Sequence, residues 1–433
     1  MTDAVRGSAD DGRSATQPGA LDRSRLRRVV AVLSTVQIVS WGCLYYAFAA
    51  LQSSITADTG WSSVSVTGAF SLSQFVSAGV GIWVGRHIDV FGPRRVMTAA
   101  SVLAVPGVAT VALAPNLSAF YVGWVLTGAA MAGTLYPPAF AALTHWAGDR
   151  RVRALTTLTL VAGLASTVFA PLAAGLEDWL GWRQAYLVLL AVLALITIPL
   201  HWWGLDRPWH PAEPPPPPDS ALTEGGPSSG RPTYLSSVAR STPFVLLTAA
   251  NALTSLAVFA VVVNLVPMLL EQGLTRNLAA IALGLGGVGQ VIGRLGYARF
   301  EAATTVTVRT VSVLVAVALA TAALALAPAA ATLLIALGMV LGLARGIYTL
   351  VQATAVTDRW GPAGYGTLNG LLTAPALVAS ASAPFVGAAL AHLLGSYSAA
   401  FLVLAGVAAV AAALAAFASP TGSTPASRPP GSR

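Results

Sequence analysis

Arg345 is the residue whose type and position point most directly to chemistry. It lies about 22 Å along the apolar stretch 330–356, if that stretch is a helix that rises 1.5 Å per residue. A guanidinium in such a stretch is costly to bury and usually marks a functional site. No Asp or Glu lies inside any long apolar stretch, except near the ends at Glu177 and Glu271. Because a planar guanidinium matches the two oxygens of a carboxylate, we expect a ligand to supply the negative charge.

Further polar groups follow Arg345 at helical spacing. Tyr348, Thr349 and Gln352 come three, four and seven residues later, so one face of the predicted helix is polar. In an alternative interpretation Arg345 binds backbone carbonyls or extends toward the membrane surface, and only holds helices together. The sequence leaves both interpretations open.

A second cluster combines glycines, one acid and two bases. Gly85, Asp89, Gly92, Arg94 and Arg95 have the spacing G-x-x-x-D-x-x-G-x-R-R. The glycines permit a tight turn and a close approach of helices. We expect Asp89 to face a neighbouring helix N-terminus and the arginines, as a charge lock that breaks when packed halves rock. An ordinary positively charged loop would explain the arginines but not the Gly–Asp–Gly spacing.

These residues must be positioned by membrane helices. The 433-residue chain is 55% hydrophobic and only 9% charged, whereas a soluble domain is about 25% charged. A bilayer-spanning helix needs about 20 apolar residues. Twelve such runs are found: 29–51, 64–85, 95–115, 118–144, 152–176, 183–203, 243–270, 277–298, 306–327, 330–356, 364–392 and 397–418. Since Val311–Leu326 does not alternate as a barrel strand would, we predict an all-α membrane protein of twelve transmembrane helices.

The chain divides by composition into two bundles with polar segments around them. The polar segment between the bundles contains Pro214–Pro218, which is typical of a stiffened linker. The predicted parts are a disordered tail 1–28, a six-helix bundle 29–203, a linker 204–242, a second six-helix bundle 243–418 and a tail 419–433.

The arginines indicate the orientation. The net charge is +8 and all 24 basic residues are Arg, but no soluble domain carries a basic face for nucleic acid. Placing both termini in the cytoplasm leaves 21 Arg on the inner side and two, Arg183 and Arg276, on the outer side. This asymmetry predicts cytoplasmic termini and linker in a cell (inner) membrane.

The two bundles resemble each other in sequence. Gly81–Arg86 corresponds to Gly289–Arg294 at an offset of 208 residues, and Ala170-Pro171 corresponds to Ala383-Pro384. Matches in the same order indicate two six-helix pseudo-repeats, an architecture of secondary transporters.

The motif from Gly85 to Arg95 resembles the signature of the major facilitator superfamily, and it lies between the second and third predicted helices as in that family. The resemblance implies that the first, fourth, seventh and tenth helices line a central cavity. At the matching positions it adds binding residues to Arg345, Tyr348 and Gln352. These are Trp41, Tyr45, Tyr136 and Asn251.

Shorter strings resemble the monocarboxylate and oxalate–formate porter branch. They are Gly60-Trp61-Ser62, Gly92-Pro93-Arg94-Arg95 and the Pro-containing fifth helix. The resemblance does not extend to that branch's substrate-binding base, because the eighth predicted helix has only Arg294, near its cytoplasmic end. Tyr297 occupies the place equivalent to Asp89, so we expect a one-sided lock.

We therefore expect a secondary active transporter of a small organic anion such as a monocarboxylate, working as a monomer in the lipid bilayer by alternating access. Drug or metabolite efflux is an alternative, and a non-transporting membrane sensor is another. No enzyme, cofactor or metal centre is expected. The chain has no GxxxxGK[ST] or GxSxG motif, its single cysteine, Cys43, lies within an apolar run, and its five His are scattered along the sequence.

Overall fold

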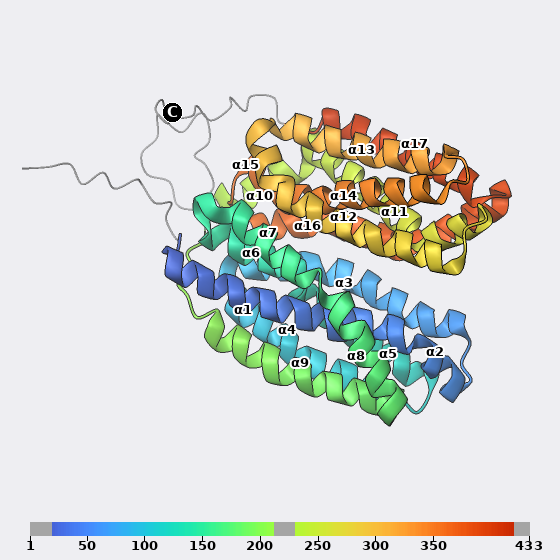
Figure 1. Ribbon diagram of the computed structural model, residues 1–433. Helices are drawn as coiled ribbons and strands as arrows, with labels where there is room; N and C mark the ends of the chain where they lie inside the picture. The colour runs from blue at the N-terminus through green and yellow to red at the C-terminus, as the bar shows by residue number, and fades with distance from the viewer. Residues whose placement is uncertain (1–19, 212–229, 420–433) are drawn as a thin grey trace, which may run out of the picture.

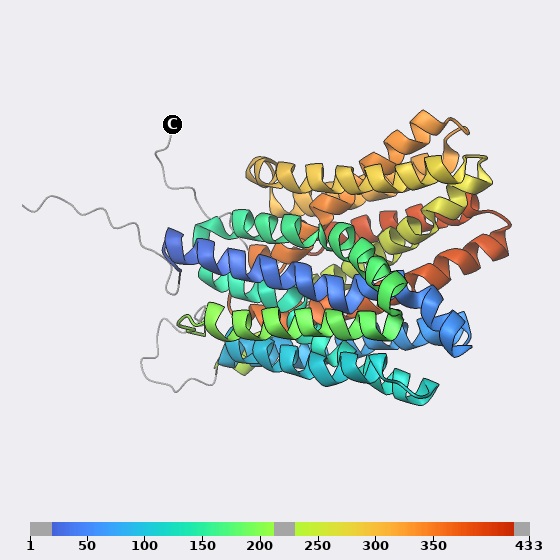
Figure 2. The ribbon, with the colours of Figure 1, turned by 60° about the horizontal axis from the view of Figure 1, so that its bottom comes forward.

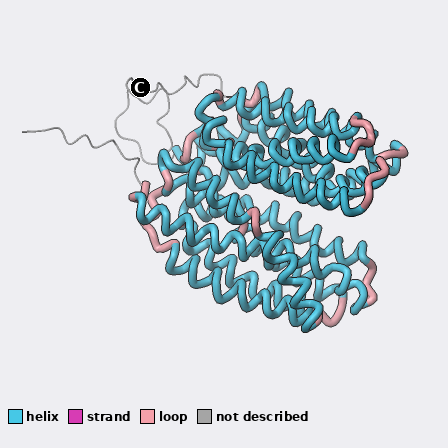
Figure 3. Tube along the Cα trace, in the orientation of Figure 1, coloured by secondary structure: helices cyan, strands magenta, loops and turns pink. Residues whose placement is uncertain are grey.

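The computed structural model describes residues 20–211 and 230–419, and every regular element in those residues is a helix (Figure 3). Twelve helices or helix pairs in this part of the chain are long and apolar enough to cross a membrane. The predicted fold class is confirmed.

The N-terminal half runs from α1 to α9. Its helices are α1 (Arg23–Trp41), α2 (Ala47–Thr59), α3 (Ser63–Phe91), α4 (Pro93–Ala112), α5 (Leu117–Thr134), α6 (Tyr136–Trp146), α7 (Arg151–Ala162), α8 (Ala165–Leu180) and α9 (Trp182–Gly204), with a π-helical turn η1 (Gly42–Tyr46) and a 3-10 turn η2 (Gly148–Arg150).

The C-terminal half follows the linker. Its helices are α10 (Gly230–Arg240), α11 (Thr242–Glu271), α12 (Arg276–Ala303), α13 (Val306–Leu326), α14 (Ala331–Thr354), α15 (Thr357–Trp360), α16 (Tyr365–Leu394) and α17 (Tyr397–Ala416).

The two halves lie side by side, as the blue-to-green and yellow-to-red ribbons show in Figure 1. They come together at the end where α1 begins and α17 ends, which we call the terminal end, and diverge toward the opposite end (Figure 1). Figure 2 shows the same bundle turned, with the helices of both halves running between these two ends. The contacts between halves join α3 to α16, α7 to α12 and α14, and α6 to α16.

Glycines allow two helix pairs, one within the C-terminal half and one between the halves, to approach closely. A Cβ atom on Gly342 of α14 would collide with the backbone of Gly286 on α12, so these two helices touch backbone to backbone. A Cβ atom on Gly85 of α3 would likewise collide with the carbonyl of Gly366 on α16, in the other half. Small residues at such positions are typical of membrane helix packing.

The division into tails, bundles and linker differs from the predicted one in two places. α1 begins at Arg23, inside the residues expected to form a tail, because Asp22 caps it by accepting hydrogen bonds from the amides of Ser24 and Arg25. The last part of the predicted linker forms α10. The predictions for 1–19, 212–229 and 420–433 lie outside the described residues.

Candidate functional site

Arg345 lies near the middle of α14, half-buried between the two halves. Its guanidinium carbon is 5.4 Å from the ring centroid of Phe259 on α11, a cation–π contact. The side chains of Tyr45, Tyr46 and Tyr136 of the N-terminal half lie near it. Among the described residues we find no hydrogen bond or ion pair to its side chain, so the cation lacks a charged partner.

Aromatic rings of the N-terminal half form a wall beside this cation. The Trp41 ring lies 5.0 Å from the Tyr136 ring and 5.3 Å from the Tyr45 ring, between centroids, and the Tyr45 and Tyr46 rings are 5.4 Å apart. The π-helical turn η1 contains both Tyr45 and Tyr46. The indole nitrogen of Trp41 is buried and has no hydrogen-bond partner among the described residues. The wall therefore offers O–H and N–H donors.

A break in the fourth span positions Tyr136. The helix stops at Leu135 and restarts as α6, because Pro138 has no N–H for the carbonyl of Thr134 four residues earlier. The amide nitrogen of Gln37, fully buried on α1, donates to this carbonyl at 2.7 Å and to the Leu135 carbonyl at 3.2 Å. Gln37 thus fixes the break from which Tyr136 starts.

Arg294 on α12 is a second buried cation, and the sequence analysis did not assign it to the site. Its residue is only 4% exposed, and it interacts electrostatically with both Arg345 and Tyr136. One terminal nitrogen donates to the carbonyl of Thr159 on α7 at 2.6 Å, across the two halves. Its Nε atom is buried without a partner among the described residues. The signal was a second Arg within an apolar run, the same signal that identified Arg345.

Tyr348, Gln352 and Asn251 form a separate group. The Tyr348 hydroxyl lies 2.5 Å from Asn251 Oδ1 and 3.1 Å from Ser255 Oγ, and the Asn251 amide donates to the Leu372 carbonyl at 3.2 Å. All three predicted residues line a small, mostly apolar pocket, which Arg345 does not line. The structure thus brings Trp41, Tyr45 and Tyr136 to Arg345, whereas Tyr348 and Asn251 bind each other.

Asp89 joins the two halves at the terminal end. Its side chain accepts hydrogen bonds from the Gly366 amide at 2.8 Å, the Thr367 amide at 2.8 Å and the Thr367 hydroxyl at 2.7 Å. These groups form the first turn of α16, so a residue of one half caps a helix of the other. The residue is 7% exposed.

The two arginines of the same motif lie differently. The Arg94 guanidinium binds Asp206 Oδ1 at 2.5 Å and the Trp202 carbonyl at 2.7 Å, so it fastens the start of α4 to the end of α9 within one half. Arg95 is exposed. Gly92 has a left-handed backbone with φ 76°, which glycine adopts most easily.

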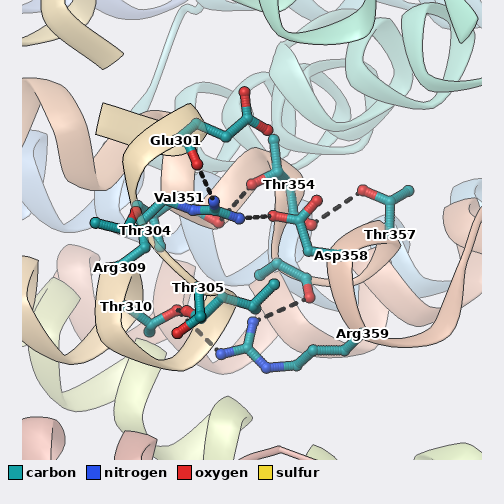
Figure 4. Close-up of polar contacts among 12 residues, drawn as sticks. Glu301, Thr304, Thr305, Arg309, Thr310, Val351, Thr354, Thr357, Asp358 and Arg359 are labelled. Carbon is teal, nitrogen blue, oxygen red and sulfur yellow. Dashed lines mark hydrogen bonds and ion pairs between the residues drawn. The ribbon is translucent and has the colours of Figure 1, made fainter. Parts of the chain in front are cut away.

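Asp358 on α15 is a second acid between the halves. Its Oδ1 atom is 2.7 Å from Arg151 of the N-terminal half and its Oδ2 atom is 2.5 Å from Arg309 on α13. Figure 4 shows Arg309 against Asp358, and Arg359 turned toward Thr310 on the other side of α15. Burial lowers the pKa of the Arg359 guanidinium to about 10, although the charge of Asp358 opposes this. The Arg359 guanidinium therefore stays charged near neutral pH.

The position equivalent to Asp89 in the second half does not join the halves. Tyr297 is fully buried and its hydroxyl lies 3.0 Å from Thr354 Oγ1, which links α12 to α14 within the C-terminal half. The described contacts between the halves, through Asp89, Arg294 and Asp358, lie toward the terminal end, where the structure is closed.

Comparisons with known proteins agree with this architecture. The family model described as the Major Facilitator Superfamily matches residues 33–318. Among solved structures, the transporter FucP in the outward conformation is 15% identical, with a TM-score of 0.69 over 90% of this chain and 99% of that chain. A variant of the E. coli fucose:proton symporter FucP is 15% identical, with a TM-score of 0.68 over 92% of this chain and 99% of that one.

The human organic anion transporter MFSD10 (TETRAN) is 16% identical, with a TM-score of 0.68 over 90% of this chain and 99% of that chain. No curated protein matches the sequence. These solved structures share the fold, while the match of the family model over most of the length identifies the family. The chain is a multi-pass membrane protein that belongs to the major facilitator superfamily of transporters.

Proposed function

We propose that this protein is a secondary active transporter of a small organic anion, which binds between the halves at Arg345. One observation carries the proposal. The Arg345 guanidinium lies in the membrane interior with no hydrogen bond or ion pair to any described residue. An isolated charge in that environment is costly, and an anionic ligand would compensate it.

The groups around Arg345 support an anion because they are hydrogen-bond donors. Arg294 adds a second positive charge, Trp41 adds an N–H with no partner in the described part of the chain, and Tyr45 and Tyr136 add hydroxyls. The two related solved structures are described as a fucose:proton symporter and an organic anion transporter, so the fold serves both neutral and anionic substrates. The charge of this site favours the anion, and a monocarboxylate has the two oxygens that one guanidinium can bind.

The contacts of Arg294 suggest how binding would affect the halves. Its guanidinium holds the Thr159 carbonyl at the end of α7. An anion between Arg345 and Arg294 would compete with that carbonyl for the same donors, and so weaken one link between the halves.

We propose that the terminal end faces the cytoplasm of a cell (inner) membrane, that both termini are cytoplasmic, and that a monomer cycles by alternating access.

Flux into proteoliposomes tests this proposal. Arg345→Ala should lower the initial rate of monocarboxylate uptake by about 100-fold, because a charge-assisted contact contributes about 1.5–3 kcal/mol. Arg345→Lys should retain part of the rate, since it keeps the charge but loses the planar fork. Arg299→Ala is the matched control, because Arg299 is exposed on α12, and its uptake should equal that of the wild type. Unchanged uptake by Arg345→Ala would exclude the anion site.

A second candidate function is efflux of an apolar drug or metabolite. The cavity lined by Leu247, Leu314, Val351 and Leu372 favours it, since most of its lining is apolar. An apolar substrate would still be transported by Arg345→Ala and would be blocked by Leu314→Trp. Ligand binding without any flux would indicate a sensor instead.

A further inference from the structure

Trp209, in the first residues of the linker, packs against the terminal end of the N-terminal half. Its ring centroid lies 4.2 Å from that of His145 and 5.8 Å from that of Trp146. The Trp146 indole donates to the carbonyl of Pro208 at 3.1 Å, which holds this part of the linker in place. The first described residues of the linker therefore pack onto α6.

Trp209 also contacts the residue that joins the two halves. Its indole nitrogen donates to the backbone carbonyl of Asp89 at 3.4 Å, a long hydrogen bond. A side chain at Gly92 would meet the Trp209 ring, so the ring lies directly against the turn after α3. The same ring lines a small cavity with Asp89, and residues of the other half, Gly364 and Tyr365, line it too.

The other end of the linker packs on the C-terminal side of this junction. In α10 the Tyr234 hydroxyl donates to the Trp360 carbonyl at 2.9 Å. A side chain at Gly364, the residue that precedes α16, would collide with Leu235. The two described ends of the linker thus both lie beside the contact between Asp89 and α16.

We propose that Trp209 is a positioning residue of the gate at the terminal end. Its ring covers the junction between Asp89 and α16 and keeps water from the carboxylate. The three hydrogen bonds of Asp89 to α16 are then made where water competes weakly, and such bonds are stronger. The linker sets the balance between the closed and open terminal end, whichever substrate is carried.

Cysteine labelling tests this role without any substrate. Ala141→Cys in a Cys43→Ser background places a thiol in the cavity that Trp209 lines, at a residue that is 4% exposed. The measurement is its rate of reaction with a membrane-impermeant maleimide in the purified full-length protein. Trp209→Ala should raise this rate by about tenfold, because water that reaches Asp89 would weaken its bonds to α16 by about the net contribution of one hydrogen bond.

Two further variants separate gating from folding. Trp209→Phe keeps the ring and should restore the slow rate, whereas Trp203→Ala, at a Trp that is 70% exposed, should leave the rate unchanged. Equal rates for Trp209→Ala and Trp203→Ala would overturn the proposal. If Trp209→Ala does not fold, Trp209→Leu replaces it. Loss of folded protein in both variants would also overturn the proposal, because it would show that Trp209 is needed for the bundle to fold.

Discussion

The carboxylate of Asp89 should control how often the terminal end opens. It accepts three hydrogen bonds from the first turn of α16, two from backbone amides and one from the Thr367 hydroxyl. Asp89→Asn removes the negative charge. It also replaces one carboxylate oxygen by an NH₂ group, which cannot accept a hydrogen bond from the backbone amide of α16 that faces it. Hydrogen bonds to charged groups contribute about 1.5–3 kcal/mol each but are not additive, so we expect a shift of about 3 kcal/mol, which is on the order of 100-fold.

Electron–electron double resonance measures this shift directly. Spin labels at Arg153 of α7 and Arg299 of α12, both exposed and on different halves, report the separation of the halves at the terminal end. Asp89→Asn should move the distance distribution from one short peak to a population with longer distances. Asp206→Asn is the control, because Asp206 binds Arg94 within one half and is 62% exposed. An unchanged distribution in Asp89→Asn would refute the assignment of the lock to this carboxylate.

Three further predictions concern packing. Gly85→Ala should open the terminal end in the same resonance assay, since its Cβ would strike the α16 backbone, whereas Gly81→Ala, with no atom near its Cβ, should leave the distances unchanged. Gly342→Ala should lower the Tm of the detergent-solubilised protein by several degrees more than Gly284→Ala, because only the first places a Cβ against the backbone of α12. Gln37→Leu should reduce stability by about 1–3 kcal/mol in thermal unfolding, because two carbonyls lose their donor. An equal Tm for Gln37→Leu and the wild type would show that water replaces the amide.

The fold could be predicted because membrane spans are set by composition alone. A bilayer accepts only long apolar segments with internally bonded backbone, so twelve runs in the sequence became twelve spans in the structure. The helix ends were harder to predict, since they depend on caps such as Asp22 and on proline breaks such as that before Pro138.

The site was only partly predictable, because the sequence does not show how far inside a helix a residue lies or toward which helix its side chain points. The apolar run of the eighth span was placed at 277–298, which put Arg294 at its end, but α12 continues to Ala303 and carries Arg294 inside. Helical spacing placed Tyr348 near Arg345, yet only the tertiary structure shows that its hydroxyl reaches Asn251 on α11. The π-helical turn η1, which brings Tyr46 toward the same wall, has no signal in residue types.

The backbone contact between α12 and α14 has a consequence for selectivity. Glycines beside both cations make this contact: Gly293 meets the backbone of Leu343, and Gly346 meets that of Gln290. At these glycines the two backbones touch with no side chain to re-pack, so we expect α12 and α14 to move as one body. The distance between Arg294 and Arg345 then stays the same as the halves move. A solute from either side of the membrane meets the same spacing of the two positive charges.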